Sequence, residues 1–459
     1  MSHFKKLQCK QKGSALVWIL LLFLILSIPG YFISQNYNIL TPKTPGLSLI
    51  KTEEKILIEP IPGSKYHSPD GTWWGYNQSK IARFQDLVFS YYIDNTDDSN
   101  QTISNLVVLK KEGTSAWEEG VRFPTSRPGN ILVDSQGVLH VFVFEPANAQ
   151  INDSKGKLLH YFFPDSAQGD IKNFSQELVV DGDGSNETVN IRVGSAIGKD
   201  DTMVISFGLT KFNPAYNEQS EHIYFKKPNE EKWNHTFIDG LPHDFYYPYT
   251  LVTENGFSLL PIQDDFNDDG NSKTYDNIYQ KIPLFSYLNN KWGMEMLVDL
   301  STHPLAKSKP RLLEQEDLME DKDGNIHIIY KEFLDPDNLF ASSGHRHLIG
   351  KPGNFKTKKI ELGKAGANWV RLVEVDSDLY YLISRFDSLY TSPVDDIKLN
   401  EISIPDDAKG FYPYVATQKS GQVSSEYIDV LLLASDQKLY QEGLQTNYYI
   451  RIPKSDFKK

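Results

Sequence analysis

The clearest chemistry in the sequence lies in an acidic loop at positions 265–276, which reads Asp-Phe-Asn-Asp-Asp-Gly-Asn-Ser-Lys-Thr-Tyr-Asp. Its carboxylate and amide oxygens have the spacing of an EF-hand-type calcium loop, and Gly270 would allow the sharp turn. The predicted calcium ligands are Asp265, Asn267, Asp269, Asn271 and Asp276. Because the last position is Asp instead of the usual bidentate Glu, a plain acidic hairpin loop also explains the stretch.

Arginine and aromatic residues form a second candidate site, one suited to an acidic sugar. A guanidinium group binds a carboxylate through two parallel hydrogen bonds, and flat aromatic rings stack on sugar faces. The predicted ligand-binding residues are Arg127, Arg192, Arg311, Trp369, Arg371 and Tyr412. A purely structural role, in which these side chains seal the inner ring of the fold, is the alternative.

Three further residues close together in the sequence could transfer a proton, namely His243, Tyr246 and Tyr247. Eliminative cleavage of a uronate polymer needs a Tyr or His to take the proton beside the carboxyl group. It also needs an Arg or His to neutralise that carboxyl. These three residues are therefore the candidate catalytic groups.

The elements that would position these residues are β-strands in a repeated pattern. Turn residues followed by an apolar strand recur at 134–144, 199–207, 254–260, 321–330 and 376–383, and more loosely at 83–92 and 421–433. Asp-Gly and Asn-Gly favour tight turns, and β-branched and aromatic residues favour strands. Each unit continues with a second strand, a turn and often a Trp, as in Lys232-Trp233 and Lys291-Trp292.

Seven such units fit between positions 66 and 459, so the sequence predicts an all-β, seven-bladed β-propeller, with six or eight blades as the alternative counts. The last unit is short of strands. A strand from the start of the domain, at 55–60 or at 72–76, would complete it and remove exposed edges. The candidate binding residues precede the innermost strands, so they would share one mouth of the central channel.

Composition supports this fold class and limits the partners. Aromatic residues make up 12% of the 459 residues, and the only cysteine, Cys9, precedes the predicted domain. The domain therefore has no disulfide, cysteine-based zinc site or thiol nucleophile. The net charge of −13 argues against nucleic acid and favours cations, or sugars bound at local basic spots.

The N-terminal region predicts a membrane anchor. Residues 14–33 are apolar and uncharged, long enough to cross a bilayer, and follow the lysine-rich residues 1–13. The positive-inside rule keeps those lysines cytoplasmic and places the bulk of the chain outside, behind a proline-rich spacer at 34–65. A cleaved signal peptide is the alternative. The segment Lys10-Gln-Lys-Gly13-Ser-Ala-Leu also resembles the leader of type IV pilin-like proteins.

The histidines look structural. His140 and His327 each follow a turn by three positions, so we expect both to pack between blades. His345 and His347 alternate along one strand, so they share a face. To bind a metal ion, this pair would need a third ligand, and none can be identified in the sequence. We therefore expect the strand to lie at the surface.

The whole domain resembles the sialidase-like superfamily of BNR-repeat propellers, which includes some polysaccharide lyases. The resemblance rests on the pattern Asp-x-x-Gly-x-Leu/Ile-His-Val/Ile at 134–144 and 321–330, and on Lys-Trp after the second hairpin. It implies a propeller that binds or cleaves acidic glycans. We therefore expect a monomeric, membrane-tethered surface propeller that binds a glycan or a protein, with a sialidase-like or lyase-like enzyme as the alternative.

Overall fold

The computed structural model describes a large part of the second of two compact units, which comprise residues 1–45 and 46–459. The described residues are 50–51, 56–63, 75–94, 104–125, 128–146, 156–181, 187–189, 193–212, 217–241, 244–265, 278–335, 344–362, 369–385, 388–408, 411–424, 426–434 and 446–458. The predicted anchor at 14–33 and most of the spacer lie outside them. Within the described ranges, no helix combines the length and the apolar character needed to cross a bilayer.

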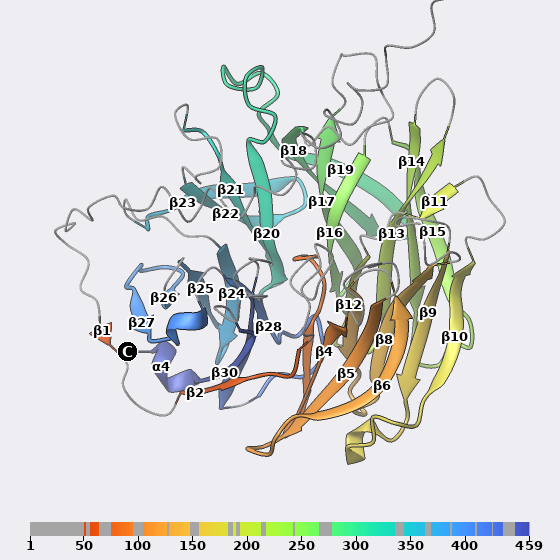
Figure 1. Cartoon of the computed structure of the whole chain (residues 1–459). Helices are drawn as coiled ribbons and strands as arrows, with labels where there is room; N and C mark the ends of the chain where they lie inside the picture. Colours follow the sequence, from red (N-terminus) through yellow and green to blue (C-terminus); the bar gives the residue numbers. More distant parts are fainter. Residues whose placement is uncertain are drawn as a thin grey trace, which may run out of the picture. The chain divides into compact units, whose positions relative to one another are not determined.

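Seven β-sheets follow one another around a common axis, so the fold is the predicted seven-bladed β-propeller (Figure 1). Blade 1 comprises β3 (Ile81–Phe84), β4 (Leu87–Asp94), β5 (Ser104–Glu112) and β6 (Glu118–Thr125). Blade 2 comprises β7 (Asn130–Val133), β8 (Leu139–Pro146), β9 (Gly156–Phe163) and β10 (Ser175–Asp181). Blade 3 comprises β12 (Gly194–Ile197), β13 (Met203–Phe212), β14 (Asn217–Lys226) and β15 (Asn234–Leu241), with β11 (Glu187–Val189) also paired to β13.

Blade 4 comprises β16 (Asp244–Thr253), β17 (Gly256–Asp265), β18 (Ile278–Leu288) and β19 (Lys291–Asp299). Blade 5 comprises β20 (Leu313–Glu320), β21 (Ile326–Glu332), β22 (Gly344–Lys351) and β23 (Asn354–Ile360). Blade 6 comprises β24 (Trp369–Val375), β25 (Asp378–Ser384), β26 (Leu389–Pro393) and β27 (Asn400–Ile402), beside which β1 (Ile50–Lys51) pairs in parallel. Blade 7 comprises β28 (Phe411–Val415), β29 (Tyr427–Ala434), β30 (Tyr448–Pro453) and β2 (Leu57–Pro60). The described helical turns are η1 (Ser166–Gln168), η2 (Asp406–Ala408) and α4 (Lys454–Phe457).

The predicted Asp-x-x-Gly turns join the first two strands of blades 2 and 5. Asp321 accepts hydrogen bonds from the backbone N–H groups of Asp323 (2.9 Å) and Asn325 (2.8 Å), and Gly324 takes the left-handed φ of 72°. Gly137 has a φ of 84° at the corresponding place in blade 2. Such turns suit aspartate, whose side chain bonds the backbone, and glycine, which has no Cβ to clash.

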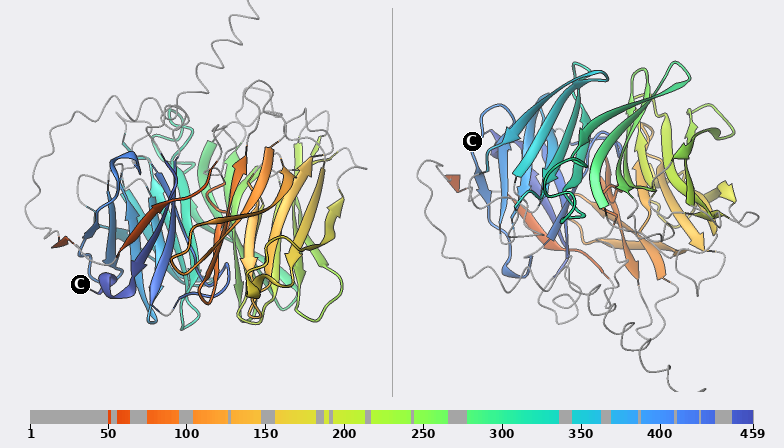
Figure 2. Two further views of the ribbon diagram at one scale, coloured as in Figure 1. Left: turned by 60° about the horizontal axis from the view of Figure 1, so that its bottom comes forward. Right: turned by 90° about the horizontal axis from the view of Figure 1, so that it is seen from above.

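The N-terminal strand β2 closes the ring, as the sequence predicted for positions 55–60. It pairs antiparallel with β30, so blade 7 combines strands from both ends of the domain (Figure 2). A buried ion pair also joins blade 7 to blade 1, because the Arg83 guanidinium bonds both carboxylate oxygens of Asp429. The Tyr449 hydroxyl approaches the same carboxylate. Closure therefore rests on a strand and on one buried charge pair.

We expect Arg83→Met to lower the free energy of unfolding by about 3–5 kcal/mol, because it leaves the Asp429 carboxylate buried without its main partner. The matched control is Arg122→Met, whose 45% exposed side chain pairs with Asp94 and Glu119 at the surface. That change should cost no more than about 1 kcal/mol. Urea unfolding measures both, and equal losses would contradict this account of ring closure.

A chain of hydrogen bonds links the turn of blade 5 to blade 6. Asp321 Oδ2 lies 3.0 Å from His327 Nε2, and His327 Nδ1 lies 2.9 Å from His347 Nε2. His347 Nδ1 then meets the Tyr381 hydroxyl at 2.7 Å. His327 therefore has the structural role that the sequence predicted. The expected surface strand was wrong, because His345 and His347 are buried beneath neighbouring blades.

Blade 2 contains a similar series of hydrogen bonds, which ends at Glu177 where that of blade 5 ends at Tyr381. His140 lies 3.5 Å from Asp134 and 2.9 Å from His160, whose other ring nitrogen lies 2.7 Å from Glu177. Burial lowers the pKa of His160 to about 4, although Glu177 acts in the opposite direction. Burial likewise lowers the pKa of His347 to about 2. Both imidazoles are neutral at physiological pH.

We expect the propeller to lose stability as the pH falls from about 6.5 to about 4. In that range the unfolded chain protonates these histidines and the folded chain does not, so protons favour unfolding. His160 alone accounts for about 3 kcal/mol, since one pKa unit is worth about 1.4 kcal/mol. Urea unfolding of wild type and His160→Gln at several pH values tests this. Identical pH slopes for the two proteins would contradict it.

Candidate functional site

The central channel has two ends, which we name by the inner strand of each blade. The strand-start end is the end at which the inner strands begin. The turn end is the end at which each inner strand turns back into the second strand of its blade. Residues 75–80, which lead into β3, lie on the axis from the strand-start end. The β28–β29 loop meets the axis from the turn end, where Ile197 and Val133 donate backbone hydrogen bonds to the carbonyl oxygens of Lys419 and Ser420.

Arg371 of β24 holds the middle of the channel together. Its guanidinium is buried and donates to the carbonyl oxygens of Pro413 (3.0 Å), Tyr76 (2.8 Å) and Glu316, and to the Tyr249 hydroxyl (2.9 Å). Although burial disfavours its charge, the neighbouring Tyr249 and Asp317 raise the pKa of Arg371. These bonds tie β24 to the lead-in residues and to blades 4, 5 and 7.

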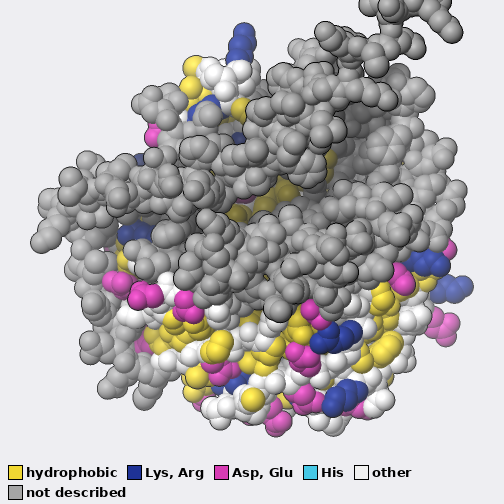
Figure 3. Space-filling model, viewed as in Figure 1, with side chains coloured by type: hydrophobic (Ala, Val, Ile, Leu, Met, Phe, Trp, Pro, Cys, Tyr) yellow, Lys and Arg dark blue, Asp and Glu magenta, His cyan; other side chains and the backbone are white. Residues whose placement is uncertain are grey.

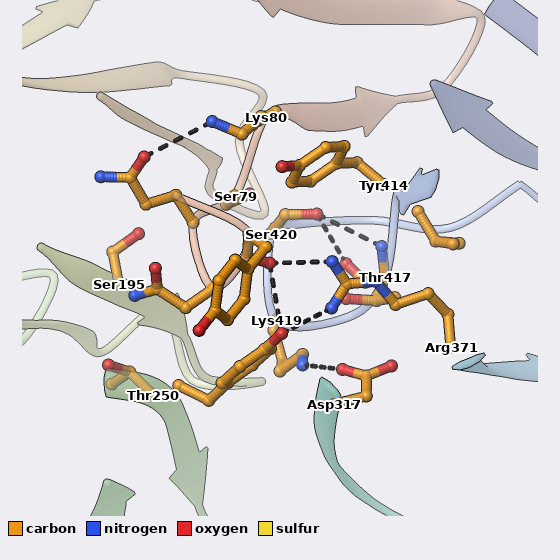
Figure 4. Close-up of a pocket in the computed structure, with 15 residues that line it drawn as sticks. Ser79, Lys80, Ser195, Thr250, Asp317, Arg371, Tyr414, Thr417, Lys419 and Ser420 are labelled. Atoms are coloured by element: carbon orange, nitrogen blue, oxygen red, sulfur yellow. Dashed lines mark hydrogen bonds and ion pairs between the residues drawn. The ribbon is translucent and has the colours of Figure 1, made fainter. Parts of the chain in front are cut away.

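A small cavity of about 50 Å³ lies on the axis between the lead-in residues and the β28–β29 loop (Figure 4). Ionisable side chains line it, namely Lys80, Asp317, Arg371 and Lys419. Asp317 accepts hydrogen bonds from Lys419 Nζ (3.0 Å) and from the Leu372 backbone N–H (2.8 Å). The cavity is too small for a sugar.

A second cavity, of about 400 Å³, opens at the turn end. It lies between the first turns of blades 2 and 3 and the β28–β29 loop, and it is lined by Asp134, Ser135, Lys199, Asp201 and Gln422 with their neighbours. Asp201 is already bonded to the Ser135 backbone N–H at 2.8 Å. Its lining contains no aromatic side chain. It therefore offers no ring on which a sugar could stack.

At the strand-start end, aromatic and charged side chains of blades 4 to 7 and of the lead-in residues form one connected group, which we call the mouth cluster. Its members are Tyr76, Tyr247, Arg311, Glu314, Lys331, Trp369 and Tyr412. Tyr76 stacks on Tyr247 with 4.4 Å between ring centroids and lies 5.0 Å from Trp369. Tyr412 meets the edge of Trp369 at 5.0 Å.

A strained bulge places Tyr247 in this cluster. The register of β16 against β17 shifts between Tyr246 and Tyr249, and Tyr247 has a left-handed φ of 53°. Non-glycine residues avoid this conformation unless the surroundings enforce it. Here the buried Gln315 side chain donates to the carbonyl oxygens of Tyr246 (3.3 Å) and Tyr247 (3.0 Å). Blade 5 therefore fixes the bulge of blade 4.

The charges of the mouth cluster come from blade 5 and the segment before it. Arg311 pairs with Glu314, whose other oxygen lies 2.5 Å from Lys331 Nζ. The Arg311 guanidinium also stands over the rings of Tyr279 (5.5 Å) and Phe333 (5.4 Å). Burial opposes ionisation of Glu314, but Arg311 and Lys331 hold the pKa of its carboxyl below the ordinary value.

Exposure distinguishes Arg311 from its neighbours. Its side chain is 38% exposed, whereas that of Glu314 is 5% exposed. Trp369 and Tyr247 are buried. Burial also raises the pKa values of Tyr76 and Tyr412, so both are neutral phenols at physiological pH. The arrangement can offer one accessible cation beside aromatic rings and phenol groups.

Several predicted site residues meet in this region and several lie outside the described residues. Tyr246, Tyr247, Arg311, Trp369, Arg371 and Tyr412 stand at or near the starts of inner strands of blades 4 to 7, as predicted. Arg127, Arg192, His243 and the calcium-loop residues Asn267, Asp269, Asn271 and Asp276 are outside the described residues, and the side chain of Asp265 is also not described. The calcium site stays a prediction. Among the described residues, no group of three or more His, Cys, Asp or Glu side chains is arranged to hold a metal ion.

The sequence analysis did not identify Tyr76, Glu314, Gln315 and Lys331 as site residues. A signal was present for two of them, because residues 314–317 read Glu-Gln-Glu-Asp in a predicted inner strand. All four side chains of that run are buried on β20. Four consecutive polar residues in a buried strand indicate that the strand faces a polar interior, which in a propeller is the axis.

Surface charge does not mark a single site by itself. In the part of the surface that Figure 3 colours, Lys and Arg side chains are interspersed with Asp and Glu side chains. An acidic ligand would therefore have to recognise individual cations such as Arg311, not a broad positive surface.

Several solved structures are similar to this chain, and the first one named here supports the fold. The chain is similar to polysaccharide lyase Uly1, with 10% sequence identity, a TM-score of 0.51 and coverage of 82% of this chain and 90% of that one. It is also similar to a fungal alcohol oxidase of the AA5 family in complex with copper (9% identity, TM-score 0.48, 86% and 76% coverage). A neuraminidase-like protein from A/bat/Guatemala/164/2009 matches at 9% identity (TM-score 0.37, 88% and 96% coverage).

No protein-family model matches the sequence, and no curated protein matches it. The order of its sheets makes the chain a seven-bladed β-propeller, and it resembles polysaccharide lyase Uly1 at low sequence identity. At this identity the likeness shows the fold, which is shared with glycan-active enzymes.

We expect Gln315→Leu to destabilise the protein by about 1–3 kcal/mol, because it leaves the buried carbonyl oxygens of Tyr246 and Tyr247 without their donor. Gln136→Leu, at an exposed turn of blade 2, is the control and should change stability by less than about 0.5 kcal/mol. Urea unfolding gives both values. An unchanged midpoint for Gln315→Leu would show that the bulge does not depend on this side chain.

Proposed function

We propose that the propeller binds an acidic glycan at its strand-start mouth, through Arg311 and the surrounding aromatic rings. The observation that supports this most is the accessible Arg311 guanidinium, which Glu314 and the rings of Tyr279 and Phe333 hold in place. A guanidinium with a fixed orientation recognises a carboxylate or sulfate group better than a mobile one, because less conformational entropy is lost on binding.

Acidic sugars fit this site better than neutral ones. The ligand's anionic group would share Arg311 with Glu314, and the phenol groups of the mouth cluster would donate hydrogen bonds to its oxygens. Glu314 remains paired with the buried Lys331, so the negative charge of Glu314 is already balanced. The net attraction at the mouth therefore favours an anion. We further propose that residues 14–33, which lie outside the described residues, tether this binding domain to a membrane.

Lyase-type chemistry is a second candidate, supported by the closeness of Tyr412 to both Arg311 and Tyr247. In such a step a base takes the proton beside the uronate carboxyl, a carbon–carbon double bond forms, and the glycosidic C–O bond breaks as its oxygen gains a proton. Arg311 would neutralise the carboxyl. Because burial keeps Tyr412 protonated, it suits donation to the leaving oxygen better than removal of the first proton. Binding without cleavage is therefore our first proposal.

We expect Arg311→Gln to weaken binding of acidic polysaccharides about tenfold or more, because a hydrogen bond to a charged group contributes roughly 1.5–3 kcal/mol. Arg122→Gln is the matched control, since Arg122 is similarly exposed and paired with carboxylates but lies on the outer strand of blade 1. Glycan-array retention of the full-length protein measures the effect. Ultraviolet absorbance at the same time detects the unsaturated uronate that a lyase would release.

The outcomes separate the two candidates. Retention without absorbance, lost in Arg311→Gln and kept in Arg122→Gln, supports a glycan-binding propeller. Absorbance that disappears in Arg311→Gln supports the enzyme. Equal retention of neutral and acidic glycans, or equal binding by wild type and Arg311→Gln, would contradict both and leave a protein partner as the better explanation.

A further inference from the structure

The buried charge on the channel axis lacks a counter-ion of its own. Arg371 is 5% exposed, and all of its hydrogen bonds go to neutral acceptors, three backbone carbonyl oxygens and one phenol oxygen. Among the described residues, no carboxylate oxygen lies within ion-pair distance of its guanidinium. Buried charges in proteins are normally paired, since an isolated one is expensive to desolvate.

The nearest carboxylate is already used. Asp317, the one acidic side chain in the lining of the axial cavity, bonds Lys419 Nζ at 3.0 Å and the Leu372 N–H at 2.8 Å. Arg371 and Lys419 together carry two positive charges against the single charge of Asp317. Lys80 lines the same cavity with its Nζ 3.1 Å from the Tyr91 hydroxyl, but burial and the nearby Arg371 lower its pKa well below the ordinary value, so we do not count it as a charge. The cavity therefore has a positive lining.

Two residues that line this cavity carry polar atoms without partners. Ser195 on β12 is 6% exposed, and its hydroxyl group has no hydrogen-bond partner. The side-chain oxygen of Asn77, which also lines the cavity, has none either. Buried polar groups almost always have partners, so these two atoms indicate an occupant that is not part of the chain. Ser195 can donate to an anion, and Asn77 can accept from a water molecule beside it.

We propose that the axial cavity binds a small monovalent anion, chloride under cellular conditions, held by the Ser195 hydroxyl group and the positive charge of Arg371. The cavity volume of about 50 Å³ suits this size, because one water molecule needs roughly 10–15 Å³ on such a scale. It accommodates a halide with a water molecule and excludes a sugar. A cation would be repelled by the lining, so the site differs in chemistry from the predicted calcium loop.

The anion would act on stability, because it binds the folded state alone. Tyr76, Tyr249, Arg371 and Tyr414 come from the lead-in residues and from blades 4, 6 and 7, and Ser195 from blade 3. An anion on the axis would thus tie together strands that are far apart in the sequence. Its binding raises the free energy of unfolding in proportion to the logarithm of its concentration once the site is saturated.

The experiment measures the thermal midpoint of the full-length protein while sodium gluconate is replaced by sodium chloride at constant ionic strength. We expect the midpoint to rise with the logarithm of the chloride concentration once the site is saturated. Ser195→Ala should need about tenfold more chloride for the same rise, since it removes a hydrogen bond to a charged group. Ser258→Ala is the matched control, because Ser258 is a buried strand serine bonded to Ser286 at 3.2 Å, away from the cavity lining.

A second measurement uses the unmodified protein. Crystals grown in sodium bromide should show an anomalous-scattering peak within hydrogen-bond distance of the Ser195 hydroxyl. Equal midpoints in chloride and gluconate, or the absence of that peak, would mean that the cavity holds water only and would overturn the proposal. A chloride response that is identical in wild type and Ser195→Ala would place the anion elsewhere and would overturn it as well.

Discussion

The buried guanidinium of Arg371 is the interaction on which the centre of this propeller depends. It bonds groups from the lead-in residues and from blades 4, 5 and 7, while its own backbone belongs to blade 6. A propeller axis is difficult to fill, because inner strands converge there without a sheet neighbour to satisfy their polar groups. A planar side chain with five N–H donors can reach several strands at once, which no aliphatic residue can do.

Filling the axis has consequences for where a ligand can bind. Residues 75–80 and the β28–β29 loop leave only a small cavity between them, so the channel is not a passage for a polymer. The strand-start mouth retains the exposed Arg311 and the aromatic rings above this closed floor. The turn-end cavity is larger but lacks aromatic side chains. The proposed recognition site thus lies at one end of the axis, and the tightly packed residues lie in the middle.

Particular residues show how far sequence reasoning reached. The turns at Asp134 and Asp321, the seven units and the closing strand at 57–60 were predictable, because local turn chemistry and strand periodicity determine them. The convergence of Arg311, Trp369 and Tyr412 was also foreseen from their places before inner strands. The sequence analysis did not predict that Glu314 and Lys331 join this group, because no periodic pattern links either of them to Arg311. The prediction that His345 and His347 lie on a surface strand was wrong. Alternation along the strand shows that the two side chains share a face, but it does not show whether other residues cover that face.

The sequence by itself therefore determined the turns and the repeat, and it favoured seven blades over six or eight and offered two candidate strands for closing the ring. All of these follow from interactions between near neighbours or from a repeat. Only the tertiary structure decided which arginine is buried and which is exposed. Arg371 and Arg311 look alike as residues before or within inner strands, yet the first meets four acceptors from distant segments and the second reaches solvent beside Glu314. Burial depends on what the rest of the ring brings into contact, and no local pattern contains that information.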